Sequence, residues 1–176
     1  GTWWLGVYGY AAGTFTVTGT VATGGGGTPA ERLANGGFET ITASTNTAPD
    51  GSWTRSAYSG TSFNVLVANS SYPHGGSDHA YLGVNNSSSQ TLDSAAVTIP
   101  SAATTATLSF WVSVVTNETG STAYDKLVVQ LVNSSGTLLT TLATLSNLDK
   151  TASAGAYVQK SYSVLGYKGQ TVKVRF

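Results

Sequence analysis

The chain contains no cysteine, and only 9% of its 176 residues are charged. Without cysteine it can form neither a disulfide framework nor a thiolate metal site. Eight basic and eight acidic residues give a net charge of zero, so no basic surface is available for nucleic acid. No apolar run reaches the roughly 18 residues that a membrane-spanning helix requires. These absences exclude nucleic-acid binding and a membrane helix, and they favour an exported β-protein.

Most of the chain consists of Thr, Ser, Gly, Ala, Val and Asn, which suit pleated sheets joined by tight turns. Apolar residues alternate with polar ones along several segments, with no helical period between them. The expected strands lie at residues 107–115, 126–132, 138–145, 157–164 and 171–176. This pattern predicts an all-β fold, an antiparallel β-sandwich of the jelly-roll type.

The first 30 residues predict a different organisation. Residues 1–23 contain an aromatic segment, Trp3–Tyr10, and an alternating segment, 14–21, which together predict a hairpin. Residues 24–30, which begin with four glycines, predict a flexible linker. The expected units are therefore a hairpin over 1–23 and a sandwich over 31–176. Because Gly1 begins within an expected strand, we expect the sequence to be a fragment or a processed piece.

The sandwich is expected to open with a tight turn, Asn35-Gly36-Gly37, because Gly accepts positive φ and Asn tolerates it. Phe38 can then fill the core, while the carboxylate of Glu39 lies beside irregular backbone. Trp53 follows this turn, and four further segments that enter the comparison below lie at residues 73–83, 108–111, 123–129 and 167–172.

In that order and spacing, residues 33–176 resemble the carbohydrate-binding, galactose-binding-like jelly-roll modules of secreted bacterial peptidases. Residues 1–23 resemble the closing hairpin of the pre-peptidase C-terminal domain. The resemblance implies a jelly roll with a bound calcium ion. Modules of this kind finish with another strand that carries an acidic pair, whereas this sequence ends at Phe176, so we expect the last strand and one ion ligand to be missing.

Three kinds of chemistry deserve comparison. Ser77, Asp78 and His79 have the residue types of a catalytic triad, but neighbours on extended chain point in alternate directions. His74 and His79 could meet on zinc only with further ligands. Calcium takes six to eight oxygen ligands from carboxylates and loop carbonyls. We therefore expect a structural calcium site at Glu39, Gly76 and Asp78. A second oxygen cluster could form from Asn117, Glu118, Thr119 and Asp125.

Sugar binding requires flat aromatic side chains on the surface. The candidates are Trp53, Tyr72 and Tyr81, although sandwich cores also use Trp and Tyr. Trp111 alternates with the inward residues of its strand and is expected to face solvent or a neighbouring sheet.

We therefore expect a non-catalytic, extracellular accessory module that tethers, targets or stabilises an upstream catalytic domain, a peptidase, in the same parent chain. Its other expected partner is a polysaccharide or a cell-surface glycan. The competing hypothesis is a structural or adhesive module that assembles into a surface layer or filament. In that case Trp3–Tyr10 and Thr171–Phe176 would pair with other chains by strand addition.

Overall fold

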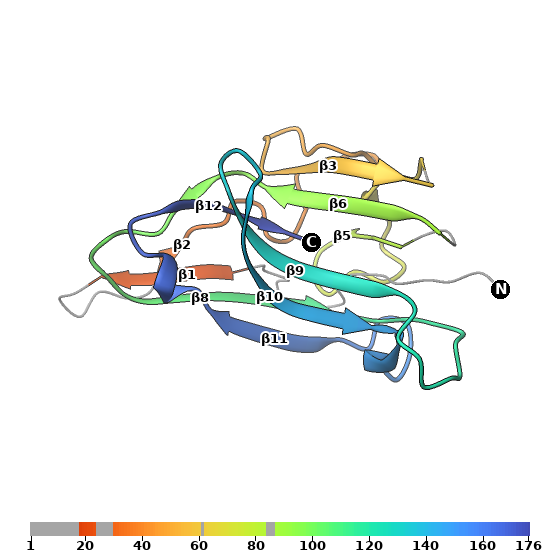
Figure 1. The fold of residues 1–176 in the computed structure, drawn as a ribbon. Helices are drawn as coiled ribbons and strands as arrows, with labels where there is room; N and C mark the ends of the chain where they lie inside the picture. Colours follow the sequence, from red (N-terminus) through yellow and green to blue (C-terminus); the bar gives the residue numbers. More distant parts are fainter. Residues whose placement is uncertain (1–17, 24–29, 61, 84–86) are drawn as a thin grey trace.

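A computed structural model describes residues 18–23, 30–60, 62–83 and 87–176. It is an all-β protein in which antiparallel sheets pack against each other, as predicted (Figure 1). Its only helical elements in the described residues are two short 3-10 turns, η1 (Asn147–Asp149) and η2 (Leu165–Tyr167). No helix in this part of the chain has the length and apolar character of a membrane span.

Two larger sheets form the sandwich, and a two-stranded sheet accompanies them. The order in the four-stranded sheet is β11 (Val158–Ser163), β8 (Ala103–Val112), β1 (Thr18–Thr23) and β2 (Ala30–Glu31). The order in the six-stranded sheet is β10 (Leu138–Ser146), β9 (Lys126–Asn133), β12 (Thr171–Arg175), β6 (Ser89–Ser94) and β3 (Trp53–Ser59), and β7 (Val97–Thr98) also pairs with β12. The small sheet contains β4 (Leu66–Ala68) and β5 (Asp78–Ala80).

The hydrophobic core lies between the two large sheets. Alternation along β8 buries Leu108, Phe110 and Val112, while the intervening residues are partly exposed. The inward residues of β9 and β12 are buried opposite them, as their alternation predicted. The rings of Phe110 and Phe176 meet edge to face at 5.2 Å, which joins the two sheets through one contact.

The segment Thr18–Thr23 belongs to the sandwich, and its assignment to a separate hairpin unit is corrected here. As β1 it pairs with β8 from Thr18↔Ser109 to Thr23↔Ala103, and it pairs with β2 on its other side. Its alternating pattern fits an interior strand as well as a hairpin, because periodicity does not name the partner strand. Residues 1–17 and 24–29, which hold the remainder of the expected hairpin and linker, lie outside the described residues.

The strand-addition hypothesis for Thr171–Phe176 is also wrong. Strand β12 lies inside the six-stranded sheet, paired with β9 on one side and with β6 and β7 on the other. Its backbone groups are therefore already used by neighbours of the same chain. The other proposed segment, Trp3–Tyr10, lies outside the described residues.

Candidate functional site

The turn at residues 35–38 is built around Trp53, which is 0% exposed. The indole Nε1 of Trp53 donates a hydrogen bond of 3.0 Å to the carbonyl oxygen of Asn35. The Trp53 ring packs against Phe38 at 5.2 Å and against Phe176 at 6.3 Å between ring centroids. A ring enclosed in this way cannot stack on a sugar, so the assignment of Trp53 as a ligand-binding residue is corrected: it is a core residue.

The predicted turn is present, but its glycines do not supply the positive φ angles. These belong to Asn35 (φ 49°) and Phe38 (φ 65°), and the amide of Phe38 donates to the Asn35 carbonyl at 3.0 Å. Positive φ is unusual for a bulky residue. Because the Phe38 side chain is 1% exposed, its burial offsets the cost of this backbone conformation. The prediction that Phe38 fills the core is confirmed.

Glu39, the next residue, holds the loop at residues 76–78. Its carboxylate accepts hydrogen bonds from the amide of Ser77 (2.9 Å to Oε2, 3.1 Å to Oε1) and from the amide of Asp78 (3.0 Å to Oε1). Gly76 has φ +70°, and a Cβ atom there would overlap the Glu39 carboxylate. The three residues expected to form a calcium site are therefore in one place, brought together by hydrogen bonds of the chain itself. We call this arrangement the Glu39 clamp.

The electrostatics of the Glu39 clamp are unfavourable for a second negative charge. Asp78 is 5% exposed, and its burial, together with the neighbouring Glu39 carboxylate, raises the pKa of Asp78. The surface hollow beside it is lined by two apolar residues, Ile41 and Ala68, and by six oxygen-bearing side chains, those of Glu39, Thr42, Asn69, Ser70, Ser77 and Asp78.

This donor set has the chemistry of a site for a hard cation. Against that reading, the three amide hydrogen bonds of the Glu39 clamp already use part of the capacity of the Glu39 carboxylate. Within the described residues, no group of three or more His, Cys, Asp or Glu side chains is placed to hold a metal ion. Any ion here would therefore depend on hydroxyl, amide and carbonyl oxygens as well as on the two carboxylates.

The two histidines make different contacts. His74 stacks on Trp111, with 4.3 Å between ring centroids, whereas His79 lies in β5 and is 3% exposed. The ring of His79 lies edge-on to Tyr81 at 6.4 Å. Burial lowers the pKa of His79 to about 4, although a hydrogen bond with the backbone of Asn69 acts in the opposite direction. The two rings thus serve packing against different neighbours.

Aromatic side chains also gather on the outer face of the four-stranded sheet. Trp111 of β8 lies on this face, covered by His74, and Tyr157 contacts His74 edge-on at 5.3 Å. The hydroxyl of Tyr157 donates to the carbonyl oxygen of Tyr72 at 3.0 Å, and Tyr72 is 43% exposed. We call His74, Trp111, Tyr157 and Tyr72 the outer aromatic cluster.

Sequence reasoning named Tyr72 but missed the outer aromatic cluster as a unit. The available signal was that Trp111 is out of phase with the buried residues of β8. The other sugar-binding candidate, Tyr81, is half-buried beside His79.

A second hollow lies at the loop between β8 and β9, where the sequence indicated a separate oxygen cluster. It is lined by Ser87, Asn117, Glu118, Thr119, Gly120, Tyr124 and Asp125. Burial and the nearby Asp125 carboxylate raise the pKa of Glu118. The predicted neighbours Glu118 and Asp125 are therefore close enough to interact.

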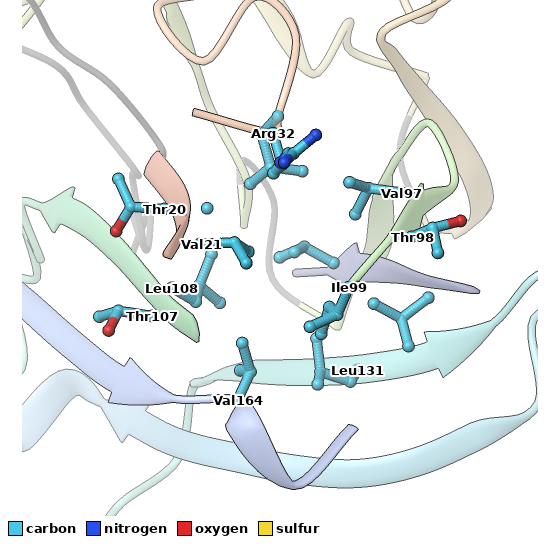
Figure 2. A pocket seen from close by; sticks show the side chains of 14 residues that line it. Thr20, Val21, Arg32, Val97, Thr98, Ile99, Thr107, Leu108, Leu131 and Val164 are labelled. Atoms are coloured by element: carbon cyan, nitrogen blue, oxygen red, sulfur yellow. The ribbon is translucent and has the colours of Figure 1, made fainter. Parts of the chain in front are cut away.

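An apolar cavity lies between the two large sheets (Figure 2). Its volume is about 30 Å³. Val21, Leu108, Ile99, Leu131 and Val164 are among its lining residues, and Arg32 lies at one side of it (Figure 2). One water needs roughly 10–15 Å³ of such space, so this cavity is a packing defect too small for a sugar ring.

Comparison with known proteins gives no relative: no family model, no curated protein and no solved structure matches this chain.

Proposed function

We propose that this chain is a non-catalytic accessory module of a secreted bacterial enzyme, with a peptidase as the parent, and that it holds the enzyme on a polysaccharide or cell-surface glycan. The observation that carries the proposal is the outer aromatic cluster on an otherwise polar sheet face. Two of the residues considered as metal ligands have structural partners: Glu39 accepts hydrogen bonds from the loop at residues 76–78, and His74 stacks on Trp111.

The outer aromatic cluster supports glycan contact because it combines apolar ring surface with polar edges. Tyr72 is its most exposed named ring at 43%, and Tyr157 holds the backbone of Tyr72 in place. On the same face, Ser109 of β8 and Ser161 of β11 share a hydrogen bond of 2.7 Å, and hydroxyls of this kind can bond to sugar hydroxyls.

Removing the exposed ring should weaken binding to glycans. We expect Tyr72→Ala to lower affinity for the bound glycan about tenfold, the loss typical of one important contact residue. The measurement is retention on insoluble cellulose, chitin and bacterial cell walls, followed by titration with the matching soluble oligosaccharide. Tyr124→Ala is the matched control, because Tyr124 is 67% exposed but lies in the β8–β9 loop. Equal losses in both variants, or no retention of the native chain, would refute the glycan site.

The chain itself should not hydrolyse casein or common polysaccharides, with or without added metal ions. Ser77 is the residue that tests this expectation most directly, because it is exposed and its side chain can be truncated without disturbing the core. Turnover by the native chain that disappears in Ser77→Ala would overturn the accessory-module proposal. Product release is measured over a pH series so that the lowered pKa of His79 does not hide activity.

We further propose that calcium strengthens the Glu39 clamp. If the folded protein binds the ion, calcium at about 100 times its dissociation constant adds about 2.7 kcal/mol to the free energy of unfolding. Glu39→Gln should remove this calcium dependence, since the amide lacks the charge that attracts a hard cation. The same variant should also lower the melting temperature in chelator, because an amide is a weaker acceptor for the amides of Ser77 and Asp78.

The calcium dependence and the melting temperature in chelator distinguish a Glu39 clamp that binds calcium from one held by hydrogen bonds alone. Identical melting curves of the native chain in millimolar calcium and in chelator would remove calcium from the account and leave the hydrogen-bonded clamp. Asp125→Asn is the control for the second acidic hollow and should leave the response at Glu39 unchanged.

The competing proposal, self-assembly into a layer or filament, finds less support in the described strands. The longer edge strands β3, β10 and β11 are candidates for pairing between molecules. Two of them carry a basic residue, Arg55 in β3 and Lys160 in β11, and charged residues on an edge disfavour strand addition. A ladder of oligomers in size-exclusion chromatography at high concentration would favour assembly over the accessory role.

A further inference from the structure

The outer face of the six-stranded sheet carries a hollow where the chain between β6 and β7 bulges away from β12. Asp93 of β6 pairs with Arg175 of β12, and Val97 of β7 pairs with Val172 of the same strand. The three residues between Asp93 and Val97 therefore lie opposite only two residues of β12, as in a β-bulge. The extra residue interrupts the ladder and bends the bulged strand, so the sheet opens at this point.

The hydrogen bonds of the bulge hold its backbone away from β12. The amide of Val174 donates to the side-chain Oγ of Ser94 at 2.9 Å, in place of a backbone carbonyl. The amide of Ala95 donates to the carbonyl oxygen of Ser52 at 2.6 Å, outside the ladder between β6 and β12. Ala95 and Ala96 are exposed and have short side chains, so they leave the hollow open.

Polar side chains from three neighbouring strands line the hollow. They include Thr54 and Ser56 of β3, Asp93 of β6, and Lys173 of β12. Because the neighbours of Lys173 along β12 are buried in the core, the alternation of the strand places Lys173 on the outer face. The volume of the hollow is about 300 Å³, which lies at the lower end of the range for small-molecule sites and suits a single sugar ring.

The charges around the hollow leave one cation unpaired. Arg175 binds Asp93 through two hydrogen bonds of 2.7 Å, one to each carboxylate oxygen, so these two charges cancel. That contact is the only ion pair within the described residues, and Lys173 therefore has no carboxylate partner there. The nearby Asp50 carboxylate accepts from the amide of Ser52 at 3.0 Å and does not line the hollow. Each oxygen of Asp93 can still accept a further hydrogen bond, so the hollow combines an unpaired ammonium group with an available acceptor.

We propose that this hollow binds a sugar residue that carries a carboxylate group, a uronic acid. Lys173 pairs with the carboxylate, and Asp93 accepts a hydrogen bond from a ring hydroxyl. The hydroxyls of Thr54 and Ser56 bond to further hydroxyls of the same ring. Phosphate matches the hollow less well, because it would place a doubly charged group against the Asp93 carboxylate, and a neutral sugar would leave Lys173 unpaired. The hollow and the outer aromatic cluster lie on different sheets, so this inference does not depend on glycan contact at that cluster.

The test titrates the isotope-labelled full chain with glucuronate and follows the backbone amide shifts by NMR. We expect saturable shifts at residues 94–96 and at Lys173. Glucose has the same ring without the carboxylate, and acetate has the carboxylate without the ring, so each should bind at least about tenfold more weakly. Lys173→Gln should weaken glucuronate binding by about tenfold or more and leave glucose binding unchanged. Ser56→Ala, at an exposed side chain, should weaken glucuronate binding about threefold.

The matched control is Lys160→Gln, which removes the same charge from the other large sheet. Lys160 is half-buried, as Lys173 is, but it lies in β11, so its replacement should leave glucuronate binding unchanged. Tyr72→Ala should also leave it unchanged. Failure of the outer aromatic cluster and failure of this hollow can therefore be told apart.

Four results would overturn the proposal. The first is the absence of saturable shifts at residues 94–96 in the native chain. The second is equal weakening by Lys173→Gln and Lys160→Gln, which would indicate non-specific attraction by net charge. The third is acetate or phosphate binding as tightly as glucuronate, which would identify a general anion site. The fourth is glucose binding as tightly as glucuronate, which would show that the carboxylate is not recognised.

Discussion

Replacing Trp53 by alanine is expected to reduce the free energy of unfolding by about 3–5 kcal/mol, the range for truncating a buried large aromatic residue. The reason is that three features depend on this one side chain. It fills the space between Phe38 and Phe176, and its indole nitrogen holds the Asn35 carbonyl. Loss of the ring would also expose the turn in which Phe38 adopts positive φ. The measurement is urea denaturation at neutral pH.

Trp53→Phe separates packing from hydrogen bonding. It retains most of the ring volume but removes the indole donor from the Asn35 carbonyl, which still accepts a hydrogen bond from the amide of Phe38. Loss of one hydrogen bond of this kind costs about 0.5–1.5 kcal/mol. We therefore expect the phenylalanine variant to lie between the native chain and the alanine variant. Tyr124→Ala, at a side chain that is 67% exposed, should change stability little. If the free energy of unfolding of Trp53→Ala equals that of Tyr124→Ala, the turn at residues 35–38 does not depend on Trp53.

The alternation of apolar and polar residues predicted which side chains of a strand are buried, but it did not predict which strands pair with each other. Alternation identified the buried faces of β8, β9 and β12 because burial of one face imposes a period of two. It could not place β1 beside β8, or β12 between β6 and β9, because those pairings join residues far apart in sequence. The same limit explains why Thr171–Phe176 resembled an edge strand in the sequence and is an interior strand in the fold.

The same limit applies to the candidate site: features set by neighbouring residues could be predicted from the sequence, whereas contacts between distant residues could not. The turn chemistry of residues 35–39 correctly indicated a core residue at Phe38. Glu39 was grouped with Gly76 and Asp78 only as expected calcium ligands, and the structure joins Glu39 to their loop through hydrogen bonds. The role of Trp53 was not visible, because an aromatic residue after a turn can serve a core or a surface. The outer aromatic cluster was missed for a related reason: it joins the loop at Tyr72 and His74 to Trp111 and Tyr157.

Acid should destabilise the protein through His79, with an effect close in size to that of Trp53→Ala. Burial lowers the pKa of His79 from 6.5 to about 4 in the folded state. Above pH 6.5 the histidine is neutral in both the folded and the unfolded chain and contributes no pH dependence. As the pH falls from 6.5 towards 4, His79 becomes protonated in the unfolded chain but stays neutral in the folded chain. Proton binding therefore stabilises the unfolded state relative to the folded state. Between pH 7.5 and 4.5 this amounts to about 2–3 kcal/mol.

Other titrating groups near β5 shape the same profile. Asp78 has the opposite effect on stability. Because its pKa is raised in the folded state, its protonation as the pH falls stabilises the folded chain relative to the unfolded chain. Burial also lowers the pKa of His74, which adds to the acid sensitivity. The Glu39 carboxylate faces Asp78 within the clamp. The contribution of His79 must therefore be isolated by a variant that changes it alone.

His79→Gln provides that comparison, since the amide keeps a donor for the Asn69 carbonyl but does not titrate. We expect the native chain to lose about 2–3 kcal/mol more than this variant between pH 7.5 and 4.5, measured by urea denaturation at each pH. His74→Gln is the matched control and should remove a smaller part of the pH dependence, because His74 is partly exposed and His79 is 3% exposed. Parallel stability profiles for the native chain and His79→Gln would show that His79 accepts a proton in the folded state as readily as in the unfolded chain. The burial of His79 in β5 would then not govern the acid response.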